Sequence, residues 1–253
     1  MKGTCMRCCL LIGGATLLWG GCASSYLVPG GPADMARLGV DATQRAALTD
    51  AGVRRELARQ PLATFPVAIA VARVQAADYA SYAYHRSAAQ GAYTVITVRD
   101  VATDADFAAI AQLPRVAGVA PLKRILLDRE LNSDLELREA AAKLHAGMLL
   151  FYTFDTQFDT DHHVQPLGLI TLGLFPTRVE RVTCTASAVL MDVANGYLYA
   201  VEESTAKDDQ LANAWSSGQA VEDIRRRVER KAFSELVESF KTQWPRVLAT
   251  YDR

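Results

Sequence analysis

The chain has 253 residues, of which 50% are hydrophobic and 22% are charged. This balance is typical of a chain with a packed core and excludes wholesale disorder. The formal net charge is −1 at pH 7. Nucleic-acid binding requires a basic field that such a balance does not supply, so we expect no nucleic-acid partner.

A short apolar stretch at the N-terminus ends at a cysteine. It runs from about Cys8 to Trp19 behind two basic residues, which is the length of a secretory signal and too short for a membrane-spanning helix. Two glycines then place slim side chains directly before Cys22. The run Leu17-Leu18-Trp19-Gly20-Gly21-Cys22 resembles the signal peptide and lipobox of bacterial lipoproteins.

This resemblance implies that residues 1–21 form a lipoprotein signal peptide and that Cys22 becomes the palmitate-bearing N-terminus. Residues 22–43, which contain Pro29-Gly30-Gly31-Pro32, are predicted to be a lipidated tether. Ala23 and Ser24 follow the cysteine, and the absence of Asp there favours the periplasmic face of the outer membrane over the inner membrane. The alternatives are an ordinary signal peptide with an incidental cysteine and an uncleaved apolar anchor.

Cys184 is the one thiol that would remain after cleavage and lipidation, because the other four cysteines lie at or before Cys22. A lone cysteine forms no intrachain disulfide, even in an oxidising periplasm. The apolar, β-prone surroundings of Cys184 predict a small buried side chain, whereas a reactive thiolate needs a helix N-terminus or a nearby cation.

The first predicted elements of the domain are a helix and two strands. A short helix is expected from about Thr43 to Arg59, ended by Pro61. The apolar stretch Phe65–Val74 has the composition of a central buried strand. Tyr93–Val98 alternates and is rich in β-forming residues, which predicts a second strand.

Capping boxes predict the next two helices. Thr103 and Asp106 have the spacing of one box, whose helix ends before Pro114, and Ser133 and Glu136 have the spacing of another. The second helix places Leu137, Ala141 and Leu144 on one face. The strands expected around these helices are Val116–Ile125, interrupted by Pro121, and Met148–Phe154.

The rest of the chain is predicted to form a β-meander and a long helix. Asn195-Gly196 supplies the two residues with positive φ that a type I′ hairpin needs, which sets Val193 opposite Leu198 and Met191 opposite Ala200. The helix is expected from about Val221 to Trp244, with Pro245 marking its end. The meander strands are Leu167–Phe175, Val182–Val193 and Tyr197–Glu202, and the inner stripe of the helix is Val221, Ile224, Val228, Ala232, Leu236 and Phe240.

The order of these elements predicts a single α/β domain over residues 44–253. Its fold class is a mixed β-sheet with a C-terminal β-meander, covered by helices as an α/β sandwich.

The pattern also resembles a module of periplasmic lipoproteins. It combines the Pro-led strand Phe65–Val74, a helix ending in Ala140-Ala141-Ala142-Lys143-Leu144 that runs into Met148–Phe154, and the hairpin around Asp192–Tyr199. It is similar to the module shared by the N-terminal domain of the Tol-system translocation protein and the curli-secretion lipoprotein, and to the rhombotarget lipoproteins. The resemblance implies an envelope domain that binds or assembles, without catalytic residues to carry over.

Acidic and histidine residues gather after the strand Met148–Phe154. Asp and His side chains can bind a metal together, which makes Asp159, Asp161, His162 and His163 candidate ligands, with Asp155 beside them. Their spacing lacks a helical i, i+4 face, so we favour a solvated loop with no metal and no cofactor. The sequence contains no Gly-x-Ser-x-Gly elbow, Gly-rich phosphate loop or His-Glu-x-x-His motif, so we expect no catalytic residues and no enzyme.

Two further groups have open alternatives. Arg225-Arg226-Arg227 is predicted to be a solvated helix face, because Glu222 and Asp223 precede it at ion-pair spacing; an anion site is the alternative. A second group lies between predicted strands, where exposed tyrosines would form a partner surface and buried ones would cover the sheet. This group consists of Tyr79, Tyr82 and Tyr84, beside His85.

These patterns together predict a lipid-anchored periplasmic protein whose noncatalytic α/β domain binds or helps to assemble an envelope protein partner. The lipid would hold the domain near the membrane and raise its effective concentration for such partners. One alternative is an oligomeric secretion or channel accessory lipoprotein in which Leu167–Phe175 inserts or packs between subunits. The other is a metal-assisted hydrolase that uses Asp159, Asp161, His162 or His163.

Overall fold

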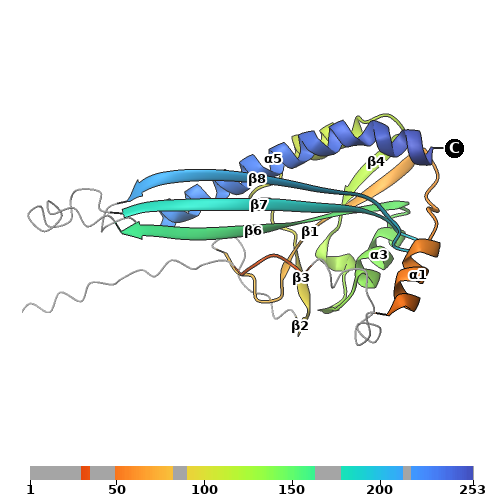
Figure 1. Ribbon diagram of the computed structural model, residues 1–253, viewed down its shortest axis with the longest axis horizontal. Helices are drawn as coiled ribbons and strands as arrows, with labels where there is room; N and C mark the ends of the chain where they lie inside the picture. Colours follow the sequence, from red (N-terminus) through yellow and green to blue (C-terminus); the bar gives the residue numbers. More distant parts are fainter. Residues whose placement is uncertain (1–29, 35–48, 82–89, 163–177, 213–217, 253) are drawn as a thin grey trace, which may run out of the picture.

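The described part of the chain folds around a six-stranded mixed sheet (Figure 1). The computed structural model describes residues 30–34, 49–81, 90–162, 178–212 and 218–252. The strand order is β3-β1-β6-β7-β8, and β4 pairs with the first half of β1, beside β3. The strands are β1 (Val67–Ala76), β3 (Tyr93–Ile96), β4 (Val116–Pro121), β6 (Met148–His162), β7 (Arg178–Asp192) and β8 (Leu198–Ala212).

Strand β1 lies at the centre of the sheet. It is parallel to β4 and β6 and antiparallel to β3, while β6, β7 and β8 form an antiparallel meander. A parallel neighbour needs a crossover connection, and α3 (Asp134–Lys143) lies in the connection from β4 to β6. A separate short ladder pairs β2 (Gln90–Gly91) with β5 (Glu130–Leu131), and η1 (Arg124–Leu126) precedes it.

Helices cover both faces of the sheet. α2 (Asp104–Ala111) and α5 (Gly218–Tyr251) pack on one face, and α3 packs on the other. Because side chains alternate along a strand, β1 supplies both layers. Val67, Ile69 and Val71 lie in the core under α2 and α5, and Ala70, Ala72 and Val74 lie in the core under α3. The α/β class predicted from the sequence is therefore confirmed.

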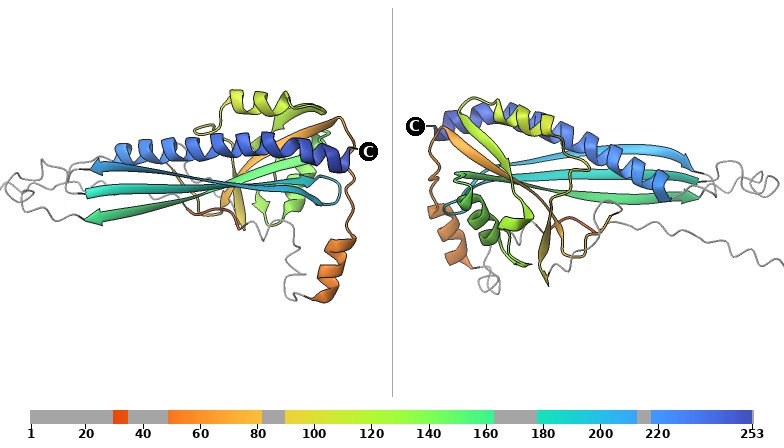
Figure 2. Two further views of the ribbon diagram at one scale, coloured as in Figure 1. Left: turned by 45° about the horizontal axis from the view of Figure 1, so that its top comes forward. Right: turned by 180° about the vertical axis from the view of Figure 1, so that it is seen from behind.

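The two predicted capping boxes are present. The Thr103 and Asp106 pair caps α2, and the Ser133 and Glu136 pair caps α3. Helix α1 (Asp50–Ala58) begins at Thr49, whose hydroxyl accepts a hydrogen bond from the Gly52 N–H at 3.2 Å. None of the residues of α1 is buried, and the helix stands apart from the sheet (Figure 2).

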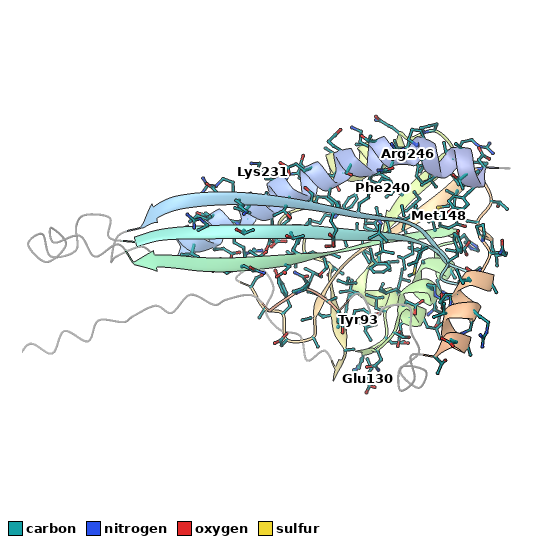
Figure 3. The ribbon with its side chains drawn as sticks, in the orientation of Figure 1. Tyr93, Glu130, Met148, Lys231, Phe240 and Arg246 are labelled. Atoms are coloured by element: carbon teal, nitrogen blue, oxygen red, sulfur yellow. The ribbon has the colours of Figure 1, made fainter. Side chains whose placement is uncertain are left out.

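Helix α5 lies along the sheet with its predicted apolar stripe inward. Phe240 points toward the sheet, whereas Lys231 and Arg246 project away from it (Figure 3). The stripe residues Ile224, Val228, Ala232, Leu236 and Phe240 are buried, and Val221 is half-buried.

The predicted end of this helix at Pro245 is wrong, because α5 continues to Tyr251. A proline inside a helix removes one backbone hydrogen bond. Trp244 holds the chain in place there: it is fully buried, and its indole N–H donates to the Pro114 carbonyl at 2.8 Å. Buried Val247 lies on the next turn.

Strands β6, β7 and β8 extend beyond the rest of the sheet as an arm (Figures 1 and 2). β1 pairs with β6 only as far as Phe151, while the β6–β7 ladder continues to the pair His162 and Arg178. The prediction that residues 155–162 form a loop is wrong, since their backbone belongs to β6. β7 supplies the hydrogen-bonding partner that keeps this stretch extended.

Candidate functional site

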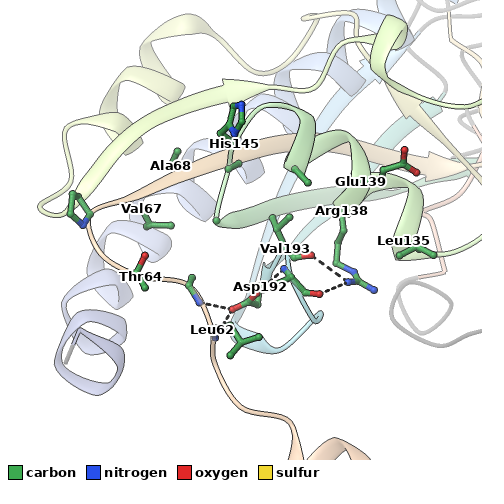
Figure 4. A pocket seen from close by; sticks show the side chains of 16 residues that line it. Leu62, Thr64, Val67, Ala68, Leu135, Arg138, Glu139, His145, Asp192 and Val193 are labelled. Carbon is green, nitrogen blue, oxygen red and sulfur yellow. Dashed lines mark hydrogen bonds between the residues drawn. The ribbon is translucent and has the colours of Figure 1, made fainter.

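An open groove of about 680 Å³ lies beside the β7–β8 turn (Figure 4). Its walls are the segment leading into β1, the outer side of α3 with the residues after it, and the turn itself. Leu62 and Leu135 stand on its rim, with 58% and 59% of their surfaces exposed. Gly147 lies in the lining, where an added Cβ would come within 2.9 Å of Cγ2 of Val67.

One buried carboxylate holds the groove wall against the turn. Asp192 is 1% exposed, and its Oδ2 accepts hydrogen bonds from the N–H groups of Leu62 at 2.7 Å and Ala63 at 2.8 Å. The Tyr199 hydroxyl donates to the same oxygen at 2.7 Å, and the Ala194 N–H donates to Oδ1 at 2.8 Å. Charge-assisted bonds to a buried carboxylate are strong, so Asp192 fixes the path of the chain into β1.

The turn itself differs from the predicted type I′ hairpin. Met191 pairs with Leu198, and Leu190 pairs with Ala200, so the predicted register is wrong. Gly196 has a φ of +74°, but Asn195 does not have a positive φ. The Asn195 side chain instead accepts from the Tyr197 N–H at 2.9 Å and donates to the Gln60 carbonyl at 2.7 Å. These side-chain bonds stabilise a connection between β7 and β8 that is longer than the predicted two-residue turn.

Helix α3 contributes a positively charged side chain to the groove. Nε of Arg138 donates to Asp134 at 2.6 Å, and Nη1 donates to the carbonyls of Val193 at 3.3 Å and Ala194 at 3.4 Å. His145 is exposed at the end of α3, with a φ of 55°. Arg138 and Asp192 are already bonded within the fold, so the groove offers mainly apolar side chains and backbone to a ligand, with the exposed side chains of Glu139 and His145 among them. Such a surface suits an apolar protein segment better than a free ion.

A second group of charges is buried between β1, the segment after β3, and α5. Arg225 is 0% exposed and donates to both oxygens of Glu222 at 2.8 and 2.6 Å, to Glu229, and to Asp100 at 3.1 Å. Arg73 donates to Asp100 at 2.8 Å and to the Tyr79 hydroxyl at 2.9 Å. This cluster joins α5 to the central strand. Its buried charges are tolerated because each side chain has partners of opposite sign.

The structure separates the three arginines that the sequence groups together. The predicted solvated face is wrong for Arg225, which is enclosed in the charge cluster. The prediction is confirmed for Arg226, which is exposed and pairs with Asp223 at 2.6 Å. Residue 225 lies on the same side of α5 as the buried residues 228 and 232, which the helical period could have indicated.

Tyr79 belongs to the interior and not to a partner surface. It is 1% exposed and accepts a hydrogen bond from Arg73, whose guanidinium lies 5.3 Å from the ring centroid. Of the two alternatives for this tyrosine, burial over the sheet is therefore the correct one, and the possible partner surface is wrong. Tyr82 and Tyr84 lie outside the described residues.

Cys184 is buried in the core under α5, as its sequence context predicted. Burial raises the pKa of its thiol to about 12. The thiolate, which is the reactive form, is therefore strongly disfavoured near neutral pH.

Several predicted residues lie outside the described part. These are the lipid-attachment residue Cys22, the side chains of Asp159, Asp161 and His162, the whole of His163, and the stretch Leu167–Phe175. In the segments that are described, no three His, Cys, Asp or Glu side chains gather as a metal site. Nor does any helix in those segments combine the length and the apolar character needed to cross a membrane.

Sequence reasoning missed the two buried charged centres of the structure. Asp192 ends an apolar strand, and Arg73 interrupts another. A charged residue in a strand that is otherwise apolar on both faces signals a buried, paired group. That signal could have identified both residues, although not their partners.

No family model and no curated protein sequence matches this chain. Among solved structures, it is similar to a candidate lipoprotein from Caulobacter crescentus CB15, with 12% identity and a TM-score of 0.25 over 46% of this chain and 80% of that one. It is also similar to the PelC dodecamer from Paraburkholderia phytofirmans, with 15% identity and a TM-score of 0.25 over 70% of this chain and 91% of that one. Likenesses with TM-scores this low carry no argument about the role of this chain.

Proposed function

We propose that this protein is a lipid-anchored component of the bacterial envelope, whose α/β domain binds a protein partner without catalysing a reaction. The observation that carries the proposal is the apolar leader that ends at Gly20-Gly21-Cys22. Acylation of Cys22 would hold the domain at the periplasmic face of the outer membrane.

The predicted tether of residues 22–43 is too long, because part of it packs on the sheet: Ala33 is 3% exposed and its N–H donates to the Thr153 hydroxyl at 3.0 Å, and the Ala76 N–H donates to the Gly31 carbonyl at 3.2 Å. Residues 22–29 would then act as the tether.

The groove beside the β7–β8 turn is the surface that we assign to the partner. Its two rim leucines, Leu62 and Leu135, are more than half exposed on the same side of the molecule. Removing such side chains from water stabilises a complex, and the hydrogen bonds of Asp192 hold the Leu62 backbone in place before binding. An apolar segment of an envelope protein is the occupant that fits this lining.

Labelling with palmitate tests the anchor. Cells that express the full chain should incorporate labelled palmitate into it, and Cys22→Ser should abolish the label and leave the leader uncleaved. Cys184→Ser is the matched control, because Cys184 is buried in the folded domain. A labelled Cys22→Ser protein, or an unlabelled parent, would refute the lipid anchor.

Photo-crosslinking in intact cells tests the groove. A photoreactive residue at Leu135 should give one discrete adduct with an envelope protein. The same residue at Ile125, which is 91% exposed and does not line the groove, is the control for random collision. Equal adducts at both positions, or none at Leu135, would contradict the assignment of the groove.

A further inference from the structure

The predicted tether joins the domain at one end of the central strand. The Ala76 N–H, at the end of β1, donates to the Gly31 carbonyl at 3.2 Å. Gly30 lies against the chain that follows β1, since an added Cβ there would come within 2.9 Å of the Tyr79 nitrogen. The point at which residues 22–29 join the domain is therefore fixed beside the C-terminal end of β1.

The groove lies at the other end of the same strand. Its lining includes Val67, the first residue of β1, and Ala194, in the β7–β8 turn. The ten residues of β1 span about 30 Å, because a strand rises about 3.3 Å per residue. The groove and the entry point of the chain are thus about 30 Å apart along the sheet.

The arm of β6, β7 and β8 extends away from the groove, past the entry point (Figure 1). β6 is parallel to β1, and Phe151 pairs with Ala72, so the register places Asp155 level with Ala76. From there β6 continues to His162, which carries the arm about 23 Å beyond the entry point. The tether and the arm therefore share one end of the domain, and the groove is at the other.

The length of the tether limits how the domain can stand on a membrane. If Cys22 carries the lipid, residues 22–29 are all that joins the bilayer to Gly30. Fully extended, they reach at most about 29 Å. Turning the groove down onto the bilayer would raise the entry point at least about 30 Å above it, which exceeds this reach. Standing the domain on its arm needs only about 23 Å, which the tether can supply.

The tether restrains one end of the domain and leaves the groove end free to swing away from the bilayer. We propose that the anchored domain keeps its arm toward the bilayer and presents the groove to the periplasm, so that the groove receives an apolar segment of an envelope protein that stands clear of the outer membrane. This orientation requires the acylation of Cys22 proposed above, and it sets the side from which the partner arrives.

Energy transfer to dye-labelled lipids tests the orientation. The full chain, purified with its lipid and reconstituted in liposomes, takes a donor dye at one introduced cysteine, since Cys184 is buried. Transfer should be several-fold more efficient from Gln157→Cys on the arm than from Leu135→Cys on the groove rim, both at exposed positions. Equal transfer from the two positions, or stronger transfer from Leu135→Cys, would overturn the proposal.

A longer tether is the matched control. Inserting about 30 Gly and Ser residues after Ser25 raises the r.m.s. span of the tether from about 16 Å to about 34 Å, which is more than the length of β1. The difference in transfer between the two labelled positions should then largely disappear. An unchanged difference would mean that the tether does not set the orientation and would also overturn the proposal.

Failure of the anchor would give a separate result. A chain that carries no palmitate and does not float with the liposomes would refute the acylation and the orientation together. An acylated chain with equal transfer from both positions would refute the orientation alone.

The photo-adduct at Leu135 tests the direction from which the partner arrives. Mass spectrometry should map the crosslinked peptide to a periplasmic segment of the captured protein. A peptide from a membrane-embedded segment would overturn the proposal.

Discussion

The Tyr199 hydroxyl donates to Oδ2 of Asp192 at 2.7 Å, across the turn that joins β7 to β8. The same carboxylate oxygen accepts from the backbone N–H groups of Leu62 and Ala63. One side chain therefore links the β7–β8 turn to the segment that leads into β1, more than a hundred residues earlier in the chain. Burial, followed by the hydrogen bond with Asp192, raises the pKa of Tyr199, so the phenol remains a donor at neutral pH.

Asp192→Asn should destabilise the domain by about 3 kcal/mol, because an amide cannot accept at both of its polar atoms and leaves buried N–H groups without acceptors. Tyr199→Phe should cost about 1 kcal/mol, since it removes one donor and leaves the carboxylate with its backbone partners. Equilibrium urea unfolding of both variants measures the difference. Equal losses would show that Asp192 does not organise the turn.

This contact also shows where sequence reasoning stops. The capping boxes at Thr103 and Ser133 were predictable because both partners of each box lie within one helical turn. The hairpin register was missed because Asp192 binds Leu62, which is 130 residues away in the chain. The burial of Arg225 likewise depends on Asp100, which is 125 residues away. Local patterns identify elements and faces, whereas the partners of buried charges depend on the assembled fold.

Arg225→Met should destabilise the domain by about 3–5 kcal/mol, because it leaves Glu222 and Glu229 buried without their main cation. Arg226→Met is the matched control on the next residue. Its side chain is half-exposed in an ion pair with Asp223, so the loss should stay below about 0.5 kcal/mol. Thermal or urea unfolding of both proteins checks the contrast. Similar losses for the two variants would contradict the buried cluster.

Gly91 should tolerate no side chain. Its φ is +135°, and a Cβ there would lie 2.5 Å from the carbonyl oxygen of Leu131 and 2.6 Å from its nitrogen. Both atoms belong to backbone that cannot move aside without breaking the β2–β5 ladder. Gly91→Ala should therefore cost about 2 kcal/mol or more. Gly118→Ala on β4 is the control, since no atom lies within 4 Å of its added Cβ. If urea unfolding shows the two variants equally stable, the close approach of β2 to β5 is wrong.

The stability of the domain should fall as the pH rises from 9 toward 12, in part because of Cys184. Burial raises the pKa of this thiol from 9.0 to about 12. Between these values the folded protein keeps a proton that the unfolded chain has released, so the free energy of unfolding decreases with pH by at most about 1.4 kcal/mol per unit. Cys184→Ala should have a shallower slope over this range. Urea midpoints at several pH values measure it, and parallel curves for the two proteins would contradict the raised pKa.

Metal binding would distinguish a metal-assisted hydrolase from a binding protein. The candidate ligands are Asp159, Asp161, His162 and His163. We expect the purified full chain to contain no stoichiometric transition metal, and we expect a chelator to leave its melting temperature unchanged. The reason is that residues 159, 161 and 162 belong to strand β6, where successive residues alternate between the two faces, so these three positions do not share one face. Replacing His162 and His163 together with Ala should then change neither the metal content nor the melting temperature. Metal at a one-to-one ratio that is lost in this double variant, together with a lower melting temperature, would instead favour the hydrolase. The melting temperature should fall in that case because a cation that binds only the folded state stabilises it.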